Sequence, residues 1–455
     1  MTRTVFVFVV CSLVLSALPG VEGKAAAPLQ LAAQAQQTPV ADPGEIAAAA
    51  SSSPADQRIT AYTLSPELHQ KAHRLSRIRL ASNLFSVCYG LFVWWLILWR
   101  RWSGKFRDWA ESFSGRRFVQ AAAYVFLLGI TIAALEFPLD VFNEFVSKAY
   151  GISVQPWSGW MMDRAKAVGL VILLGIFLAY FLYAIIRKSP RWWWLVFSLI
   201  SIPIFLFIFF VEPLVIDPMF NRFEPLSAKA PQLIPELQRV SERAGMNIPA
   251  ERMFWMEASN KTVAANAYVT GFGASKRIVI WDTALQQETT DGLLAVFGHE
   301  LGHYVLGHIW KGFLFFAGML FVLLYLGFRC VGRLLRCCGP AWGIRDIDDW
   351  ASLPALLLLL SLFGFAGSVL GSAFSRYQES EADLYGLEVT HGVLADPGQA
   401  SAQSYQRFGE RVFIDPDPNP LGVVLFFDHP TISDRVRVAV TYDPWSHGQS
   451  PRFVK

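Results

Sequence analysis

The stretch TDGLLAVFGHELGHYVL, residues 290–306, places two histidines and a glutamate inside an apolar run. The apolar residues on both sides of the motif predict one buried helix that begins at about Thr290. At about 100° per residue, His299 and His303 lie about 40° apart on that helix, so their imidazoles point the same way. The HExxH spacing therefore predicts one Zn²⁺ between the two rings, with Glu300 placed to take a proton from water. The alternative is a hydrogen-bonded polar cluster inside a helix bundle.

The rest of the chain has the composition of a membrane protein. Of its 455 residues, 53% are hydrophobic and 16% are charged, and the mean hydropathy is +0.36, well above the value of soluble proteins. Six apolar runs of about 20 residues are long enough to span a bilayer. They lie near 80–99, 118–137, 166–186, 192–212, 312–332 and 351–374.

The amino terminus differs from these six runs. Arg3 and an apolar core at residues 5–18 have the layout of a secretory signal peptide, which we place at residues 1–23. The alternative is an uncleaved first membrane helix, for which this core is short. Residues 24–56 are mainly Ala, Gln, Ser and Pro, and this composition predicts a disordered tether.

The order of the spans predicts where the chemistry lies. We expect an N-terminal membrane domain with four helices at residues 57–212 and a zinc metallopeptidase domain at 213–455 that includes the last two spans. The zinc helix is expected to run directly into the fifth span. Because the last two spans form a hairpin, the segment after residue 374 returns to the side of the two histidines. A metal ligand in that segment can reach them.

Glu379 is such a residue, in the segment SRYQESEAD at 375–383 that continues the helix of the sixth span. Glu379 and Asp383 are four residues apart and share a face, whereas Glu381 lies about 160° away from Glu379. Only one of the two glutamates can be the ligand. On this pattern alone, an exposed acidic patch is as good an interpretation as a metal site.

With these blocks in view, the sequence resembles a known family, the type-1 CAAX prenyl proteases, which are integral-membrane zinc endopeptidases with a gluzincin-type HExxH motif. The resemblance rests on five blocks in the family's order, between about residues 60 and 440. These are HExxH at 299–303, SRxxExxAD at 375–383, NAxxxG at 266–271, IxPxFNxFxPL at 216–226 and HPxxxxR at 429–435. Each block alone is weak evidence for the family, but five blocks in the family's order are strong evidence.

The resemblance implies that Glu379 is the third zinc ligand, which leaves one position open for water. Binding to zinc lowers the pKa of water from about 15.7 toward about 7. Glu300 is expected to accept the proton and pass it to the leaving amine. The family gives Asp383 as a proton donor. Because Asp383 stands one turn past the ligand, we instead expect it to hold a zinc-binding imidazole in the right tautomer.

The remaining blocks imply groups that contact the substrate. His429 and Arg435 are implied to contact the substrate carbonyl and to stabilise the oxyanion, although His429 and the proline after it could merely open a helix. Asn266, Ala267 and Gly271, with the alternating stretch after them, predict an edge strand. Such a strand can bind an extended peptide as a further strand, and the alternative is an ordinary hairpin.

Basic residues predict the orientation. The loop at 100–117 holds six Lys and Arg, 187–191 holds three and 329–345 holds four, whereas 138–163 on the other side holds one. The positive-inside rule makes these basic loops cytoplasmic and the zinc site periplasmic, in a bacterial inner membrane. Five basic residues at 58–79 argue the other way, unless they form a surface helix on headgroups.

Two further patterns receive simpler interpretations. His308 stands five residues past His303, about 140° around a continuous helix, so we expect it to miss the metal and lie at the headgroups. The five cysteines have neither zinc-finger spacing nor a disulfide framework.

Together these patterns predict a mainly α protein, a polytopic membrane helix bundle with a zincin-like metallopeptidase domain that carries a small β element. With one Zn²⁺ per chain, it would cleave membrane-associated peptides or proteins at the lipid bilayer, in processing or quality control. A net charge of +3 argues against nucleic-acid partners.

Three alternatives to this function remain open. CAAX-type processing of prenylated proteins is implied only by the family name. A non-catalytic membrane scaffold or transport protein could keep a structural zinc clasp, but a clasp has no use for Glu300. A site-2-type intramembrane protease needs an Asp ligand from a later span, and the fifth and sixth spans have none.

Overall fold

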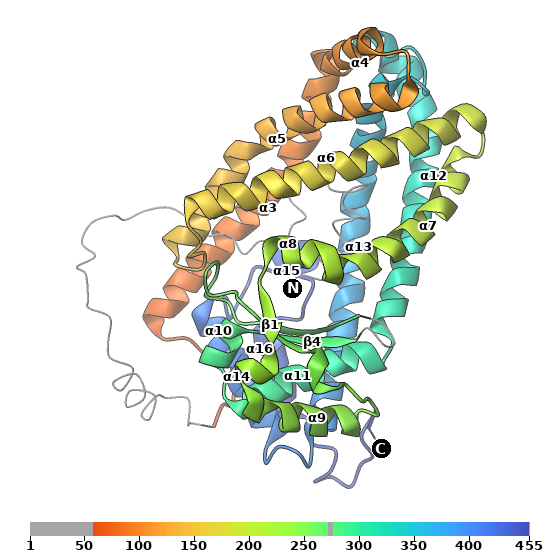
Figure 1. Cartoon of the computed structure of the whole chain (residues 1–455). Helices are drawn as coiled ribbons and strands as arrows, with labels where there is room; N and C mark the ends of the chain where they lie inside the picture. Colours follow the sequence, from red (N-terminus) through yellow and green to blue (C-terminus); the bar gives the residue numbers. More distant parts are fainter. Residues whose placement is uncertain (1–57, 272–275, 455) are drawn as a thin grey trace.

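The computed structural model describes residues 58–271 and 276–454, so the predicted signal peptide and the whole predicted tether lie outside the described residues. Long helices run along an elongated molecule, and a small sheet with shorter helices lies at one end (Figure 1). The helices are α3 (Pro66–Trp99), α4 (Trp102–Phe113), α5 (Arg117–Ala149), α6 (Trp157–Lys188), α7 (Trp193–Val211), α8 (Asp217–Phe220), α9 (Ile234–Arg243), α10 (Asp282–Gln287), α11 (Thr290–Val305), α12 (His308–Trp342), α13 (Leu353–Thr390), α14 (Pro397–Arg411), α15 (Pro420–Phe426) and α16 (Ile432–Thr441).

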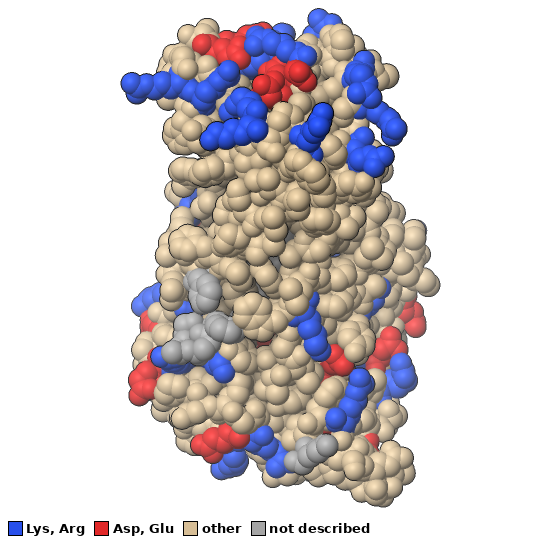
Figure 2. All heavy atoms as spheres, turned by 90° about the vertical axis from the view of Figure 1, so that its right-hand side faces the viewer, with Lys and Arg blue, Asp and Glu red and all other residues tan. Residues whose placement is uncertain are grey.

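Six helices of the described chain are long and apolar enough to cross a membrane, as the sequence predicts. They are Pro66–Trp99, Arg117–Ala149, Trp157–Lys188, Trp193–Phe220, His308–Trp342 and Trp350–Thr390. On the face in Figure 2, charged side chains gather toward the two ends and almost none lie in a band between them. That band has the character expected of a surface in contact with lipid tails.

The basic residues near the amino terminus do not form a separate surface helix. Helix α3 begins at Pro66, with the Ser65 hydroxyl accepting from the backbone N–H of Leu68, and it continues through the first span. Four of the five basic residues at 58–79 therefore lie on the first turns of this span.

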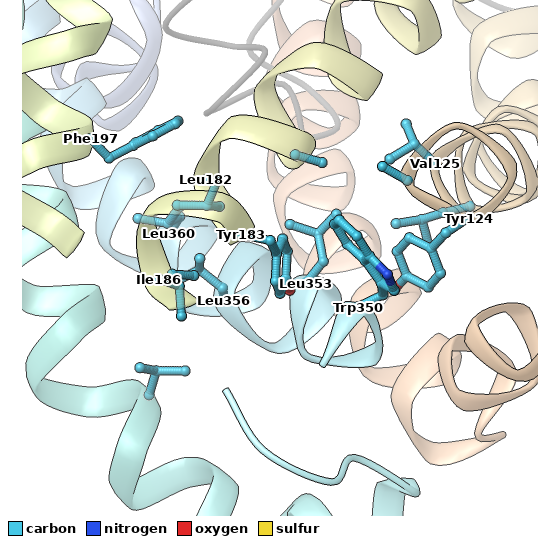
Figure 3. Packing of buried hydrophobic residues seen from close by; sticks show 14 of the residues in the cluster. Tyr124, Val125, Leu182, Tyr183, Ile186, Phe197, Trp350, Leu353, Leu356 and Leu360 are labelled. Carbon is cyan, nitrogen blue, oxygen red and sulfur yellow. The ribbon is translucent and has the colours of Figure 1, made fainter. Parts of the chain in front are cut away.

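The helices of the bundle pack tightly at the end that carries α4. Figure 3 shows Trp350 beside Tyr124 and Tyr183, with Leu353 and Leu356 from the start of α13 continuing the packing. Polar groups lie within this apolar packing and pair with one another. We call them the closed cluster, which comprises Ser103, Arg107, Tyr124, Tyr183, Asp349 and Ser352.

Each member of the closed cluster has a partner. Arg107 donates to Asp349 and to the carbonyl of Gly343. Hydroxyl pairs join Ser103 to Tyr124 at 2.6 Å and Tyr183 to Ser352 at 2.7 Å. Buried polar groups cost little when they are paired in this way, so the cluster stabilises the end of the bundle.

The sheet has four strands in the order β1-β2-β4-β3. They are β1 (Phe223–Pro225), β2 (Met253–Met256), β3 (Ala267–Thr270) and β4 (Arg277–Trp281). Strands β1 and β2 are antiparallel, β2 and β4 parallel, and β3 and β4 antiparallel with Ala267 opposite Ile280. Strand β3 therefore lies at an edge of the sheet. The alternating stretch after it, predicted as part of the edge strand, is β4, which lies inside the sheet and pairs with β3 as in the alternative, a hairpin.

Helices α11 and α13 cross closely because small residues line their contact. A Cβ atom at Gly302 of α11 would lie 3.1 Å from the Cα atom of Ala382, and one at Gly386 of α13 would lie 2.9 Å from the backbone nitrogen of His299. This close approach brings the HExxH helix against the helix that continues the sixth span.

One expectation about α11 is wrong. The helix begins at Thr290, where the Thr289 hydroxyl caps the backbone N–H of Gly292, but it ends at Val305 and does not run directly into the fifth span. Gly307 has a left-handed φ of 69°, which glycine adopts without strain, and α12 begins only after it.

Candidate metal centre and active site

His299, His303 and Glu379 meet where α11 crosses α13. The two Nε2 atoms are 3.2 Å apart. Oε2 of Glu379 lies 3.2 Å from Nε2 of His299, and Oε1 of Glu379 lies 3.4 Å from Nε2 of His303. Tetrahedral zinc with bonds of about 2.0–2.1 Å separates its ligand atoms by about 3.3 Å, so the three side chains are spaced as zinc ligands. Glu381, the competing glutamate, points elsewhere.

A buried atom of Glu379 supports a cation at this place. Oε2 is inaccessible to solvent and forms no hydrogen bond with any residue that the structure describes. The nitrogens of His299 and His429 lie within 3.3 Å of it, but without hydrogen-bond geometry. Because an unsatisfied buried carboxylate oxygen is costly, a metal ion ligated by this oxygen and two imidazoles fits the residues present.

Asp383 orients the ring of His299. Its carboxylate lies 2.8 Å from Nδ1 of His299, so that Nδ1–H donates outward and Nε2 faces the metal position. Two hydrogen bonds from Arg435, of 2.9 and 2.6 Å, and one from the Tyr405 hydroxyl, of 2.8 Å, hold the same carboxylate. This is the geometry expected of a residue that fixes a tautomer.

The carboxylates of Asp383 and Glu379 change the pKa of His299. Burial opposes a charge on the ring, but the hydrogen bonds and charges of Asp383 and Glu379 outweigh it and raise the pKa of His299 to about 9. These carboxylates therefore favour the charged ring, and a metal at this place must compete with a proton for Nε2 of His299.

Glu300 and His429 both line the cavity beside the metal position. Glu300 forms no hydrogen bond or ion pair with any described residue, so its carboxylate is available to a substrate or water. His429 holds Asp428 with Nδ1 at 2.7 Å and directs Nε2 to within 3.3 Å of Glu379. Burial opposes protonation of His429, but the carboxylates of Glu379 and Asp428 raise its pKa, which suits a hydrogen-bond donor.

Arg435 lines the same cavity, but its donors contact the residues that support the metal ligands. Its guanidinium donates to Asp383 and to Tyr405, and Nη2 stands 3.4 Å from Nδ1 of His299. These contacts direct its donors toward the support of His299. The predicted contact of Arg435 with a substrate carbonyl stays a prediction.

The predicted substrate strand lies next to the same cavity. Asn266 and Ala267 line the cavity, and the Nδ2 atom of Asn266 is buried without a hydrogen-bond partner among the described residues. Gly271, at the far end of β3 with a φ of 85°, is not among the described lining residues. Its predicted part in substrate binding stays a prediction.

The cavity has a volume of about 1050 Å³. Residues of α3, α5 and α6 line it on the membrane side, among them Arg79, Asp140 and Arg164. Residues of α11, α13 and the segment around His429 line it on the metal side. A substrate must therefore enter a partly enclosed space between the bundle and the sheet to reach the metal position.

His308 is not among the residues grouped around the metal position, as predicted, but its predicted place at the headgroups is wrong, and Tyr405 was not predicted. His308 is 3% exposed and its Nδ1 atom lies 3.1 Å from Nδ1 of His303, so it does not lie at the headgroups. The estimate of about 140° assumed a continuous helix, and Gly307 interrupts that helix. Tyr405 reaches Asp383 from α14, and no motif in the sequence marks it.

Two family models match the chain. One is described as Peptidase family M48 and matches residues 227–442, and the other as CAAX prenyl protease N-terminal, five membrane helices, and matches residues 50–222. The protein named Uncharacterized metalloprotease YhfN, of Bacillus subtilis, is 33% identical over 372 residues, which is 81% of this chain and 84% of that protein. CAAX prenyl protease 1 of Saccharomyces cerevisiae is 29% identical over 195 residues, 42% of each chain.

A solved structure shares the fold. The crystal structure of Ste24p from S. mikatae superposes with a TM-score of 0.72 over 83% of this chain and 90% of that one, at 21% sequence identity. The likeness extends over both the membrane helices and the helices that carry the candidate metal centre.

Proposed function

This chain belongs to peptidase family M48 and is a membrane-embedded metallopeptidase, and from that premise we propose that it is an endopeptidase that works with one Zn²⁺ per chain. The observation that carries the proposal is the buried carboxylate of Glu379, whose Oε2 atom has no hydrogen-bond partner among the described residues, beside the imidazoles of His299 and His303. Two neutral imidazoles and one carboxylate form a donor set of catalytic zinc sites, in which a fourth position stays open.

His299, His303 and Glu379 would hold the ion. When bound, Zn²⁺ lowers the pKa of water and polarises the scissile carbonyl. Glu300, whose carboxylate has no other described partner, accepts a proton from the attacking water and donates it to the leaving amine. His429 stands within reach of the same place and donates a hydrogen bond to the carbonyl oxygen as its negative charge grows.

Other residues keep these groups in position. Asp383 fixes the tautomer of His299, and Arg435 and Tyr405 hold Asp383. Edge strand β3 offers its backbone to an extended peptide, and Asn266 directs a free donor to the peptide backbone. Such binding reads the backbone more than the side chains, which suits an enzyme that processes many sequences.

We further propose membrane-associated peptides and proteins as substrates, in processing or quality control of membrane or exported proteins. The enclosed cavity between membrane helices and metal centre supports this choice. Removal of residues from prenylated proteins is the alternative that the names of several relatives carry. Cleavage of farnesylated peptides only, with no cleavage of the same unmodified peptides, would favour that alternative.

The bacterial inner membrane, with the metal centre on the periplasmic side, is the proposed location. The basic loops around Arg101 and Arg345 lie together at the end of the bundle opposite the metal centre, where Arg101 donates to the carbonyl of Ala341 and Arg345 pairs with Glu111. The positive-inside rule makes that end cytoplasmic. Reporter fusions at Lys105 and at the carboxyl terminus test the orientation, and a cytoplasmic carboxyl terminus contradicts it.

The catalytic proposal is tested with purified wild type and Glu300→Gln on casein and on a model peptide. We expect Glu300→Gln to keep its zinc and to cleave about 10²- to 10⁴-fold more slowly, because a general base contributes about that factor. Glu111→Gln, the same change at the far end of the bundle, is the matched control and keeps full activity. Equal activity of wild type and Glu300→Gln, or none in either, favours a structural zinc clasp.

A further inference from the structure

The second metal-binding imidazole, His303, has no carboxylate on its outer nitrogen. Its Nδ1 atom instead lies 3.1 Å from Nδ1 of His308, whose side chain is 2% exposed. The other nitrogen of His308, Nε2, lies 3.3 Å from Oε2 of Glu381. A chain of three side chains, His303, His308 and Glu381, therefore leads away from the metal position.

The hydrogen positions in this chain follow from its two ends. Nε2 of His303 faces Glu379 and His299, so it keeps its lone pair for a metal, and the ring hydrogen of a neutral imidazole is then on Nδ1. Nδ1 of His308 must accept that hydrogen, because two N–H groups cannot face each other. His308 then carries its own hydrogen on Nε2 and donates it to Glu381. One assignment satisfies every contact.

Glu381 is itself held in place. Its Oε1 atom accepts from the Tyr377 hydroxyl at 2.9 Å and from Arg452 at 3.2 Å, and Lys311 stands 3.7 Å from Oε2. Arg452 belongs to the carboxyl-terminal segment, whose backbone N–H groups at 452–454 donate to the buried carboxylate of Glu388. The position of Glu381 therefore depends on residues of α12, α13 and the carboxyl-terminal segment.

We propose that His308 and Glu381 are positioning residues for His303, and that they orient this proposed zinc ligand as Asp383 orients His299. This inference rests on the proposed zinc site. The two imidazoles thus have unlike supports, a carboxylate in direct contact for one and a carboxylate reached through a second imidazole for the other. Groups that hydrogen-bond to metal ligands in this way raise the basicity of the ligand and fix its orientation.

Two substitutions of His308 separate positioning from packing. His308→Asn keeps an acceptor close to the place of Nδ1 but leaves a gap, whereas His308→Phe fills the ring volume and has no acceptor. The measurement is zinc affinity by competition with a chelator, together with the visible spectrum of the Co²⁺-substituted protein. We expect zinc affinity to fall about 10- to 100-fold in His308→Phe, and by less in His308→Asn. A residue needed only for packing gives the reverse order.

His391→Phe is the matched control, because His391 stacks on Trp445 at 3.6 Å, away from the metal position. Its zinc affinity should equal that of wild type. Wild-type affinity in a folded His308→Phe, or weaker binding by His308→Asn than by His308→Phe, overturns the proposal. If His308→Phe does not fold, Glu381→Leu decides, since it leaves both imidazoles in place, and unchanged affinity there overturns the proposal.

The zinc-binding experiment also distinguishes failure of the proposed peptidase function from failure of the proposed positioning of His303. It does not use peptidase activity, so a wild type that binds zinc but cleaves nothing contradicts the proposed peptidase and leaves this inference standing. A wild type that binds no zinc contradicts the zinc site itself.

Discussion

The closed cluster and the metal centre are both buried groups of charged and polar side chains, but they differ in whether their atoms are satisfied. Arg107 and Asp349 of the closed cluster pair with each other, and each has further partners. At the metal centre, Oε2 of Glu379 and Nδ2 of Asn266 have none among the described residues. The polar atoms of the closed cluster find their partners within the protein, whereas those of the metal centre need a bound ligand as a partner.

This difference distinguishes the closed cluster from the metal centre without reference to any relative. A buried pair that is complete contributes to the fold, and its loss leaves an uncompensated charge. A buried group that is incomplete reduces stability until something binds to it, and binding then adds stability. The four predictions below test this contrast, in order of their expected effect on peptidase activity.

Replacement of Glu379 should have the largest effect. Glu379→Ala removes the carboxylate ligand, so we expect peptidase activity to fall to the limit of detection and bound zinc to be lost. Zinc should raise the unfolding temperature of wild type but not of this variant, because a ligand that binds the folded state stabilises it. Thermal unfolding in detergent with and without zinc measures this, and an equal rise in Glu379→Ala and wild type would contradict the prediction.

Gly386→Ala should have the next largest effect. Its new Cβ atom would lie 2.9 Å from the backbone nitrogen of His299, so α11 and α13 must move apart. A displacement of about 1 Å at a catalytic site can reduce the rate about 10²-fold. Steady-state kinetics give kcat, with Gly332→Ala as control, since that Cβ atom would meet only the end of Arg336, at 3.8 Å. Equal rates in the two variants would contradict the prediction.

Asn266→Ala should have a moderate effect, confined to substrate binding. Its unpaired donor is the group that we expect to bind the peptide backbone, and one such hydrogen bond contributes about 0.5–1.5 kcal/mol. We therefore expect kcat/KM to fall about 3- to 10-fold and zinc affinity to stay the same. Kinetics on a peptide long enough to pair with β3 measure this. An unchanged kcat/KM shows that the donor does not meet substrate.

Arg107→Leu should leave the activity of each folded molecule unchanged. Both side chains of the Arg107–Asp349 pair are less than a tenth exposed, and loss of one partner from a buried pair costs about 3–5 kcal/mol. We expect a lower unfolding temperature with full zinc content. The double variant Arg107→Leu with Asp349→Leu should recover part of the loss. Reduced activity at equal folded concentration would mean that the closed cluster and the metal centre are coupled.

Much of this fold could be predicted because its signals are local. The length of each apolar run predicts the spans, and the spacing of His299 and His303 predicts that their rings share a face. The hairpin of the last two spans predicted that a ligand after residue 374 can reach the two histidines, and α13 does continue as one helix from the span into the polar segment. The choice of Glu379 over Glu381 came from the resemblance and not from the local pattern.

The rest could not be predicted, because it depends on a backbone break and on contacts across the fold. His308 was misplaced, since a left-handed glycine at Gly307 turns the chain back toward His303. Tyr405 and Arg435 meet Asp383 only after α14 and α16 pack against α13. No spacing along the chain encodes those contacts.

Helix α13 runs without interruption for 38 residues, from the closed cluster to the metal centre, which is about 57 Å at 1.5 Å per residue. Because α13 is one long helix, a small change of its tilt at one end becomes a larger displacement at the other end. A small tilt of its membrane portion shifts Glu379 and Asp383 sideways against α11, and the tilt of a span responds to the thickness of the surrounding lipid. The acyl-chain length of the host bilayer is therefore expected to change the turnover rate of the reconstituted enzyme.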